Sequence, residues 1–262
     1  MDVKEALLKA VEKNATEKTG IAFSGGIDST LLALTCEKLG KKFTLYTTGL
    51  QGSQDIEWAT KIAIAKEWPL KIKVITSQEA VEIISEVVNI LRTDDPVQVG
   101  VGCLTYSVLH FAKENKSKTV FSGLGADETF AGYDSHHKAL EKNKVHEECE
   151  RRLKGISKDV ERDEKIAVSI GIEIRTPFLD EKLVEAAMKI KPEEKINSEQ
   201  KKIILRKIAV ELGLSEELAE RPKKAAQYGS GFDAAMEKLA KQNECKTKKE
   251  YLASLLSDEL KP

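Results

Sequence analysis

Apolar positions recur along this chain with two spacings, one typical of helices and one of short buried strands. Between residues 2 and 15 they recur at helical spacing, and Gly20 follows as a break. A short apolar run over residues 21–24 leads into two glycines, and a leucine-rich stretch then continues to Gly40. The pattern predicts an opening helix, a strand, a loop and a second helix.

The alternation of strand and helix then repeats. Further strands are expected over residues 42–48, 71–76 and 118–122, and helices over residues 55–68 and 77–92. Pro96 and the glycine-containing stretch 100–102 are expected to interrupt the chain before another apolar helix through Leu104 and Phe111. Because strands joined by helices run parallel, the sequence predicts an α/β fold with a doubly wound, mostly parallel sheet.

From about Asp127 onward the pattern is helical and charged, and it predicts no strand. Lys and Glu dominate residues 138–165, which we interpret as a solvated helix face with ion pairs four residues apart rather than as a binding tail. The change of pattern predicts two domains: an α/β domain with the N-terminal helix over residues 1–126, and a helical lobe over residues 127–262 that completes the functional site.

Composition narrows the class of protein. The 262 residues are 41% hydrophobic and 32% charged, as in folded globular proteins rather than disordered ones. Forty-two basic against 43 acidic residues give a net charge of −1, which offers no support for a nucleic-acid partner. The charged first residues do not resemble a secretory signal, and residues 96–112, the longest run without charge, are too polar and short for a membrane span. We expect a cytoplasmic protein.

The cysteines and histidines show no metal pattern. Four cysteines stand far apart without a C-x-x-C pair, so we expect reduced, structural thiols. His146 and Cys149 would lie one helical turn apart, but further ligands are lacking and a metal is not expected there. His136 and His137, near Tyr133, also lack metal spacing and are expected to border a mobile, exposed segment.

A glycine-rich loop follows the first predicted strand and reads Ser24-Gly25-Gly26-Ile27-Asp28-Ser29-Thr30. Glycines let the backbone approach an anion, and hydroxyls and the following helix N-terminus supply hydrogen-bond donors. The sequence favours a phosphate site here over a plain turn with a helix cap. Asp28 would repel phosphates unless a divalent cation such as Mg²⁺ lies between them. The loop matches neither a Walker A motif nor a dinucleotide fingerprint.

This loop resembles the pyrophosphate loop of the N-type ATP pyrophosphatases, and further stretches resemble the synthetase domain of asparagine synthetases. The motif stretches are Gly49-Leu50-Gln51-Gly52-Ser53-Gln54-Asp55, Ser122-Gly123-Leu124-Gly125-Ala126-Asp127-Glu128, Ile172-Glu173-Ile174-Arg175-Thr176-Pro177-Phe178-Leu179-Asp180, and Arg221-Pro222-Lys223-Lys224 with Gly229-Ser230-Gly231. They follow one another in order over residues 20–231. The resemblance implies an adenine-nucleotide α-hydrolase-like fold with five parallel strands.

The resemblance also implies ATP and Mg²⁺ as cofactors and an activity that adenylates a carboxylate, releases pyrophosphate and then transfers the acyl group to a nucleophile. Asp28 and Asp127 would hold Mg²⁺, and Lys223, in preference to Lys224, would neutralise phosphate charge; these three are the expected catalytic residues. The expected nucleotide-binding residues are Phe23, Ser24, Gly25, Gly26, Asp28, Ser29, Thr30, Thr48, Ser122, Gly123 and Lys223.

Other residues of the motifs have structural interpretations. Asp127 and Glu128 could cap a helix, although metal binding is favoured for Asp127. Arg175 and Asp180 are expected to form a structural ion pair beneath the site, and residues 177–179 a packed turn.

The chain departs from the family in two ways. Relatives that use glutamine begin with a glutaminase domain, whereas Met1 and Asp2 lead directly into the synthetase portion, so we expect free ammonia or a separate glutaminase. Leu124 replaces a glutamate thought to manage the proton of the incoming amine, and general-base help is worth roughly 10²–10⁴ in rate.

Three functions stay open at this point. The first is a ligase that amidates aspartate or a similar small carboxylate, the second an ATP pyrophosphatase acting in tRNA base modification or sulfur transfer, and the third a nucleotide-binding subunit. A homodimer is compatible with the sequence.

Overall fold

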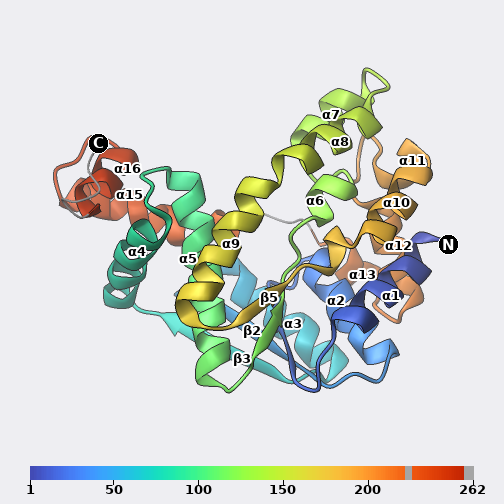
Figure 1. Ribbon diagram of the computed structural model, residues 1–262, viewed down its shortest axis with the longest axis horizontal. Helices are drawn as coiled ribbons and strands as arrows, with labels where there is room; N and C mark the ends of the chain where they lie inside the picture. The colour runs from blue at the N-terminus through green and yellow to red at the C-terminus, as the bar shows by residue number, and fades with distance from the viewer. Residues whose placement is uncertain (222–225, 257–262) are drawn as a thin grey trace.

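The computed structural model describes residues 1–221 and 226–256 and contains a five-stranded sheet at its centre (Figure 1). The strands lie in the order β3-β2-β1-β4-β5, and every neighbouring pair is parallel. Their bounds are β1 Thr19–Ala22, β2 Phe43–Leu50, β3 Leu70–Ile75, β4 Thr119–Phe121 and β5 Glu173–Arg175. The predicted doubly wound α/β fold is confirmed.

One face of the sheet is covered by the N-terminal helices. These are α1 Val3–Asn14, α2 Ile27–Lys38 and α3 Gln54–Lys66. Asp2 begins α1 by accepting a hydrogen bond from the Glu5 N–H, and the apolar stripe Val3, Leu7 and Val11 is buried. The stripe joins the largest core, which also holds the apolar side chains of α2.

The opposite face is covered by α4 Ser77–Leu91, α5 Pro96–Glu114 and α9 Ser157–Ile170. The expected interruption at residues 100–102 is wrong, because Pro96 starts α5 and both glycines lie inside that helix. A Cβ at Gly102 would lie 2.9 Å from Val87 Cγ1 and 3.2 Å from Ile166 Cδ1. The glycine therefore allows three helices to pack closely rather than ending one.

The residues after Asp127 pack against both flanks of the α/β core. Helices α10 Glu181–Lys189 and α12 Ile203–Glu211 lie beside α1 and α2, whereas α15 Phe232–Gln242 and α16 Lys248–Leu255 pack on α4 and α5. The expectation of no strand beyond Asp127 is wrong, because β5 joins the sheet beside β4. The domain division at residue 126 stays a prediction.

The remaining helices of this part of the chain have the following bounds: α6 Ala126–Thr129, α7 Asp134–Leu140, α8 Val145–Gly155, η1 Pro177–Leu179, α11 Pro192–Lys195, α13 Glu216–Ala219 and α14 Ala226–Gly229.

The expected ion pair between Arg175 and Asp180 is also wrong. Arg175 pairs with Glu173 at 2.8 Å, whereas Asp180 pairs with Lys13 at 3.0 Å and caps α10. The packed turn is confirmed as η1, with the Phe178 side chain fully buried.

The histidine pair lies in α7 between exposed residues, Asp134 before it and Lys138 after it, but His136 itself points inward. His136 is fully buried in α7, and burial lowers its pKa to about 4. The charged stretch is mostly the expected solvated face, with an Arg152–Glu148 pair four residues apart, although Arg162 turns inward.

The cysteines are free thiols. The described residues contain no cluster of three or more metal-ligating side chains. Over the same residues, none of the helices has the length and apolar character needed to cross a bilayer.

Candidate functional site

The glycine loop lies between β1 and α2, as the sequence predicts, and its conformation depends on Gly25. That residue has a φ of +67°, and a Cβ there would lie 2.8 Å from the carbonyl carbon of Trp58 in α3. Ser24 Oγ accepts a hydrogen bond from the Gly26 N–H at 3.3 Å, and Ser29 Oγ donates to the Gly26 carbonyl at 3.1 Å. The loop is therefore a tight, preformed turn at the start of a twelve-residue helix.

Arg221 fastens this turn to the C-terminal part of the chain. Its buried guanidinium donates to the Ser24 carbonyl and to Asp55 Oδ1, the latter at 3.0 Å, and lies 5.3 Å from the Trp58 ring centre. Burial lowers the pKa of Arg221, and the Asp55 carboxylate opposes that shift. The glycine loop is thus held in place both by its packing against α3 and by Arg221.

The other expected nucleotide-binding residues lie at the same end of the sheet. Thr48 is in β2, and Ser122 and Gly123 follow β4, so they flank the glycine loop that follows β1. The chain connections reverse direction between β1 and β4, which is where ligands bind in open α/β sheets. The structure brings the predicted residues of the first 127 positions together at one edge.

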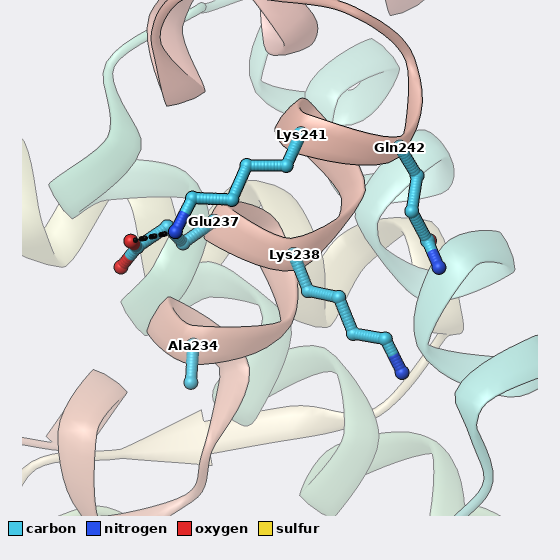
Figure 2. Close-up of a pocket in the computed structure, with 5 residues that line it drawn as sticks. All are labelled: Ala234, Glu237, Lys238, Lys241 and Gln242. Carbon is cyan, nitrogen blue, oxygen red and sulfur yellow. Dashed lines mark hydrogen bonds and ion pairs between the residues drawn. The ribbon is translucent and has the colours of Figure 1, made fainter.

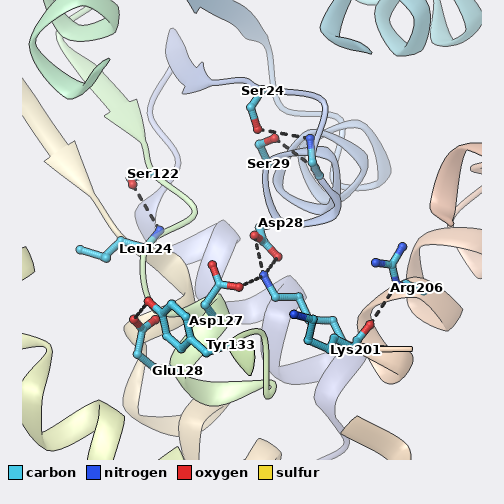
Figure 3. Close-up of polar contacts among 12 residues, drawn as sticks. Ser24, Asp28, Ser29, Ser122, Leu124, Asp127, Glu128, Tyr133, Lys201 and Arg206 are labelled. Atoms are coloured by element: carbon cyan, nitrogen blue, oxygen red, sulfur yellow. Dashed lines mark hydrogen bonds and ion pairs between the residues drawn. The ribbon is translucent and has the colours of Figure 1, made fainter. Parts of the chain in front are cut away.

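Asp28 and Asp127 approach each other from separate elements, α2 and α6, and share one cation (Figure 3). Lys202 Nζ lies 2.7 and 2.8 Å from the two oxygens of Asp28 and 2.6 Å from Asp127 Oδ1. The side chains of Lys202 and Asp28 are each 4% exposed. Sequence reasoning missed Lys202, because nothing in the run Lys201-Lys202 distinguishes it from a solvated lysine.

Two glycines make room for this ion-pair group. A Cβ at Gly132 would overlap Asp127 Oδ1, at 1.9 Å, and would lie 2.5 Å from Lys202 Cε. A Cβ at Gly123 would lie 3.1 Å from Asp28 Cβ. Larger residues at either position would push the two carboxylates out of place.

The donor set fits a magnesium–nucleotide complex. Mg²⁺ prefers oxygen ligands and is usually held by one or two carboxylates together with substrate phosphates. Asp28 and Asp127 provide two carboxylates within reach of one cation. Nearby, the Oγ1 atoms of Thr30 and Thr48 are buried without a hydrogen-bond partner, as expected for hydroxyls in a site that takes a polar ligand.

A second titratable pair lies beside this group. The Tyr133 hydroxyl donates to Glu128 Oε1 at 2.5 Å. The Tyr133 ring stacks with His136, and the guanidinium carbon of Arg152 lies 4.6 Å from the ring centre. Burial raises the pKa of Glu128 and, together with the adjacent Glu128 charge, raises that of Tyr133. This pair anchors the turn between α6 and α7.

Lys223 and Lys224 lie outside the described residues, so the lysine assignment stays a prediction. The chain before these lysines contacts the glycine loop, and the chain after them contacts the start of α3. Arg221 contacts Ser24, and on the other side the Gly229 carbonyl accepts a 2.9 Å hydrogen bond from Ser53 Oγ.

Two surface hollows lie away from this site. One, of about 410 Å³, is lined by α15 residues, among which Lys241 pairs with Glu237 at 2.8 Å (Figure 2). The other, of about 360 Å³, is lined mainly by α5 residues such as Tyr106 and His110. Neither contains a residue expected to bind nucleotide.

Comparison with known proteins assigns the family. The asparagine synthase family model matches residues 2–154 and 141–259. The chain belongs to the asparagine synthase family. It is 32% identical over 280 residues to a protein of Methanocaldococcus jannaschii named as asparagine synthetase 1, glutamine-hydrolyzing, with 92% of this chain and 50% of that protein covered. Asparagine synthetase B of Escherichia coli, also named glutamine-hydrolyzing, is 29% identical over 88% of this chain and 45% of its own length.

The chain spans about half the length of the curated relatives it matches. Among solved structures, a predicted subunit of tRNA methyltransferase from M. jannaschii aligns with a TM-score of 0.38 and 17% identity, covering 80% of this chain and 95% of that one. So loose a likeness carries no information about substrate. Family membership, which the motif series predicts, is confirmed.

Proposed function

We propose that this chain is an ATP-dependent ligase that adenylates a small carboxylic acid, aspartate or a close relative, and transfers the acyl group to ammonia to form an amide. The observation that carries the proposal is the meeting of the glycine loop, Asp28 and Asp127 at the switch point of the sheet in a chain of the asparagine synthase family. In this proposal the nitrogen enters the site as ammonia.

In the first half-reaction, a carboxylate oxygen of the substrate attacks the α-phosphorus of ATP, and the bond from that phosphorus to the bridging oxygen breaks. The N-terminus of α2, with the Ser24 and Ser29 hydroxyls, would bind the departing pyrophosphate. Asp28 and Asp127 would hold Mg²⁺, which when bound neutralises charge on the phosphates. Lys223 is the expected second source of positive charge.

In the second half-reaction, the amine nitrogen attacks the acyl carbon, AMP leaves, and the nitrogen loses a proton. Leu124 cannot accept that proton, and its side chain extends away from Asp28 and Asp127 (Figure 3). The geometry therefore supports the adenylation half more strongly than the amidation half.

The deciding experiment is the identity of the nucleotide product. Protein incubated with Mg·ATP, ammonium and aspartate should release AMP and pyrophosphate in an aspartate-dependent manner, with asparagine formed. Lys223→Ala should abolish AMP formation, whereas Lys116→Ala, on the exposed turn after α5, should not. AMP without an amide would point to another acceptor, such as a tRNA base or a sulfur carrier. If no acid supports AMP formation, the result would favour the third function, a nucleotide-binding subunit.

The amidation half has its own test. If the missing base limits the rate, Leu124→Glu should raise ammonia-dependent amide formation by about tenfold or more, since a general base contributes roughly 10²–10⁴. Acid-dependent exchange of pyrophosphate into ATP reports adenylation alone and should not change. An unchanged amidation rate would mean that another residue, or another nucleophile, serves this step.

A further inference from the structure

Lys202 occupies the position between the two carboxylates that the proposed function assigns to a metal ion. Its Nζ lies within 2.8 Å of three carboxylate oxygens, two from Asp28 and one from Asp127. These distances leave no room for a second cation between the same oxygens while the ammonium stays in place. The lysine thus fills a cation site whose two sides come from α2 and α6.

The chain is built to deliver this side chain. Lys202 has a φ of +58°, in the left-handed region that residues other than glycine adopt at an energetic cost. The side chain is 4% exposed, and Gly132 supplies the space for its Cε atom. A buried ammonium is stable only with charged or polar partners, and the two carboxylates are such partners.

We propose that Lys202 acts as a resident cation that holds Asp28 and Asp127 together in the nucleotide-free protein and excludes divalent metal until a nucleotide arrives. The inference rests on the proposed function in taking the two carboxylates as metal ligands. A free divalent ion would have to displace the ammonium and leave a buried charge beside it without a partner. A metal–nucleotide complex brings phosphate oxygens that accept hydrogen bonds from the displaced ammonium, so metal and nucleotide enter as one unit.

The test is Mn²⁺ binding to the nucleotide-free full chain, followed by electron paramagnetic resonance. Wild-type protein should show no Mn²⁺ site that depends on Asp127. Lys202→Met should create one and tighten Mn²⁺ binding about tenfold or more, because the ammonium that lies between the two carboxylates is removed. Lys201→Met is the matched control: its Nζ pairs at 2.6 Å with Asp134, which is 92% exposed, so Mn²⁺ binding should stay at the wild-type level. Equal Mn²⁺ binding by wild type and Lys202→Met would overturn the proposal.

A measurement on the wild type keeps the proposal testable if Lys202→Met does not fold. Adding Mn²⁺ without nucleotide should not raise the thermal midpoint of unfolding of the wild type. The Mn²⁺-induced shift should therefore be the same in the wild type and in Asp127→Asn. A Mn²⁺-dependent rise that is lost in Asp127→Asn would overturn the inference, because the metal would then occupy the site beside Lys202. A separate arm with ATP and Mn²⁺ tests the proposed function: lack of nucleotide binding there contradicts that function, whereas the nucleotide-free arms decide the role of Lys202.

Discussion

Two groups of buried charged residues lie in different parts of this molecule. They differ in whether their members are close together or far apart in the sequence. In the first, Arg162 lies between Asp159 and Asp163 on α9, at 2.6 and 2.9 Å, and the carboxylates also accept hydrogen bonds from Gln98 and Thr105 on α5. Its three charged residues lie within five consecutive positions of one helix, 159–163. The polar side chains that bond to them lie on the neighbouring helix α5.

The second group joins residues that are far apart in the chain. Lys202 Nζ is shared between Asp28 and Asp127, and the nearby threonine hydroxyls are buried without partners. The difference teaches that burial of an ion pair does not by itself mark a site. The charged groups on α9 are joined to one another and to polar side chains of α5, whereas the group at the sheet edge adjoins the glycine loop and the partnerless Oγ1 atoms of Thr30 and Thr48.

The largest expected effect is on stability, in the α9 group. Arg162→Met should lower the free energy of unfolding by about 3–5 kcal/mol, because Asp163, 4% exposed, would lose its charged partner. Urea denaturation measures this loss. Lys165→Met, on the same helix but in an exposed pair with Glu161, should cost less than about 1 kcal/mol. Similar losses in both variants would show that the buried pair contributes no more than a surface one.

Asp28→Asn should affect the reaction rather than the fold. We expect AMP formation to fall by roughly 10²–10³, equivalent to about 3–4 kcal/mol, as when a preorganised electrostatic contact is lost. Its effect on unfolding should be smaller than that of Arg162→Met, because Lys202 keeps its contact with Asp127. Product assays and urea denaturation on the same sample separate the two effects. Unchanged AMP formation would remove Asp28 from the mechanism.

The region around the site should also respond to pH through His136. Burial lowers the pKa of His136 from 6.5 to about 4, so the unfolded chain binds its proton first as pH falls. As pH falls from 6.5 to 4, this difference in proton binding should lower the free energy of unfolding by up to about 3 kcal/mol. His136→Phe should flatten the stability–pH curve in that window, which urea denaturation at a series of pH values measures. A His136→Phe curve parallel to the wild type would contradict this cause.

The smallest expected effect tests the packing next to the α9 group. Gly102→Ala would place a Cβ against Val87 and Ile166 and should destabilise by about 1–3 kcal/mol, the usual range for overpacking. Gly155→Ala, at the end of α8, meets no atom within 4 Å and should be neutral or slightly stabilising. Thermal unfolding of the pair measures the difference. Stabilisation by Gly102→Ala would show that α4 and α9 can move apart at little cost.

Local patterns predicted much of the fold because they report local physics. The first four strands and the helices between them follow from apolar periodicity, and the glycine loop follows from residues adjacent in sequence. The strand β5 escaped this reasoning because it has three residues, none of them fully buried. The stretch 100–102 was misread because Gly102 lets helices pack closely, and turns favour the same residue.

The sequence by itself determined the family, the order of the motifs and the position of the glycine loop between a strand and a helix, since each is carried by contiguous residues. Only the tertiary structure decided that Lys202 joins Asp28 and Asp127, and that Arg175 and Asp180 take separate partners. The physical reason is that an ion pair depends on distance in space. Residues separated by 174 positions meet only because the parallel sheet brings the ends of its strands and the start of α12 to one edge.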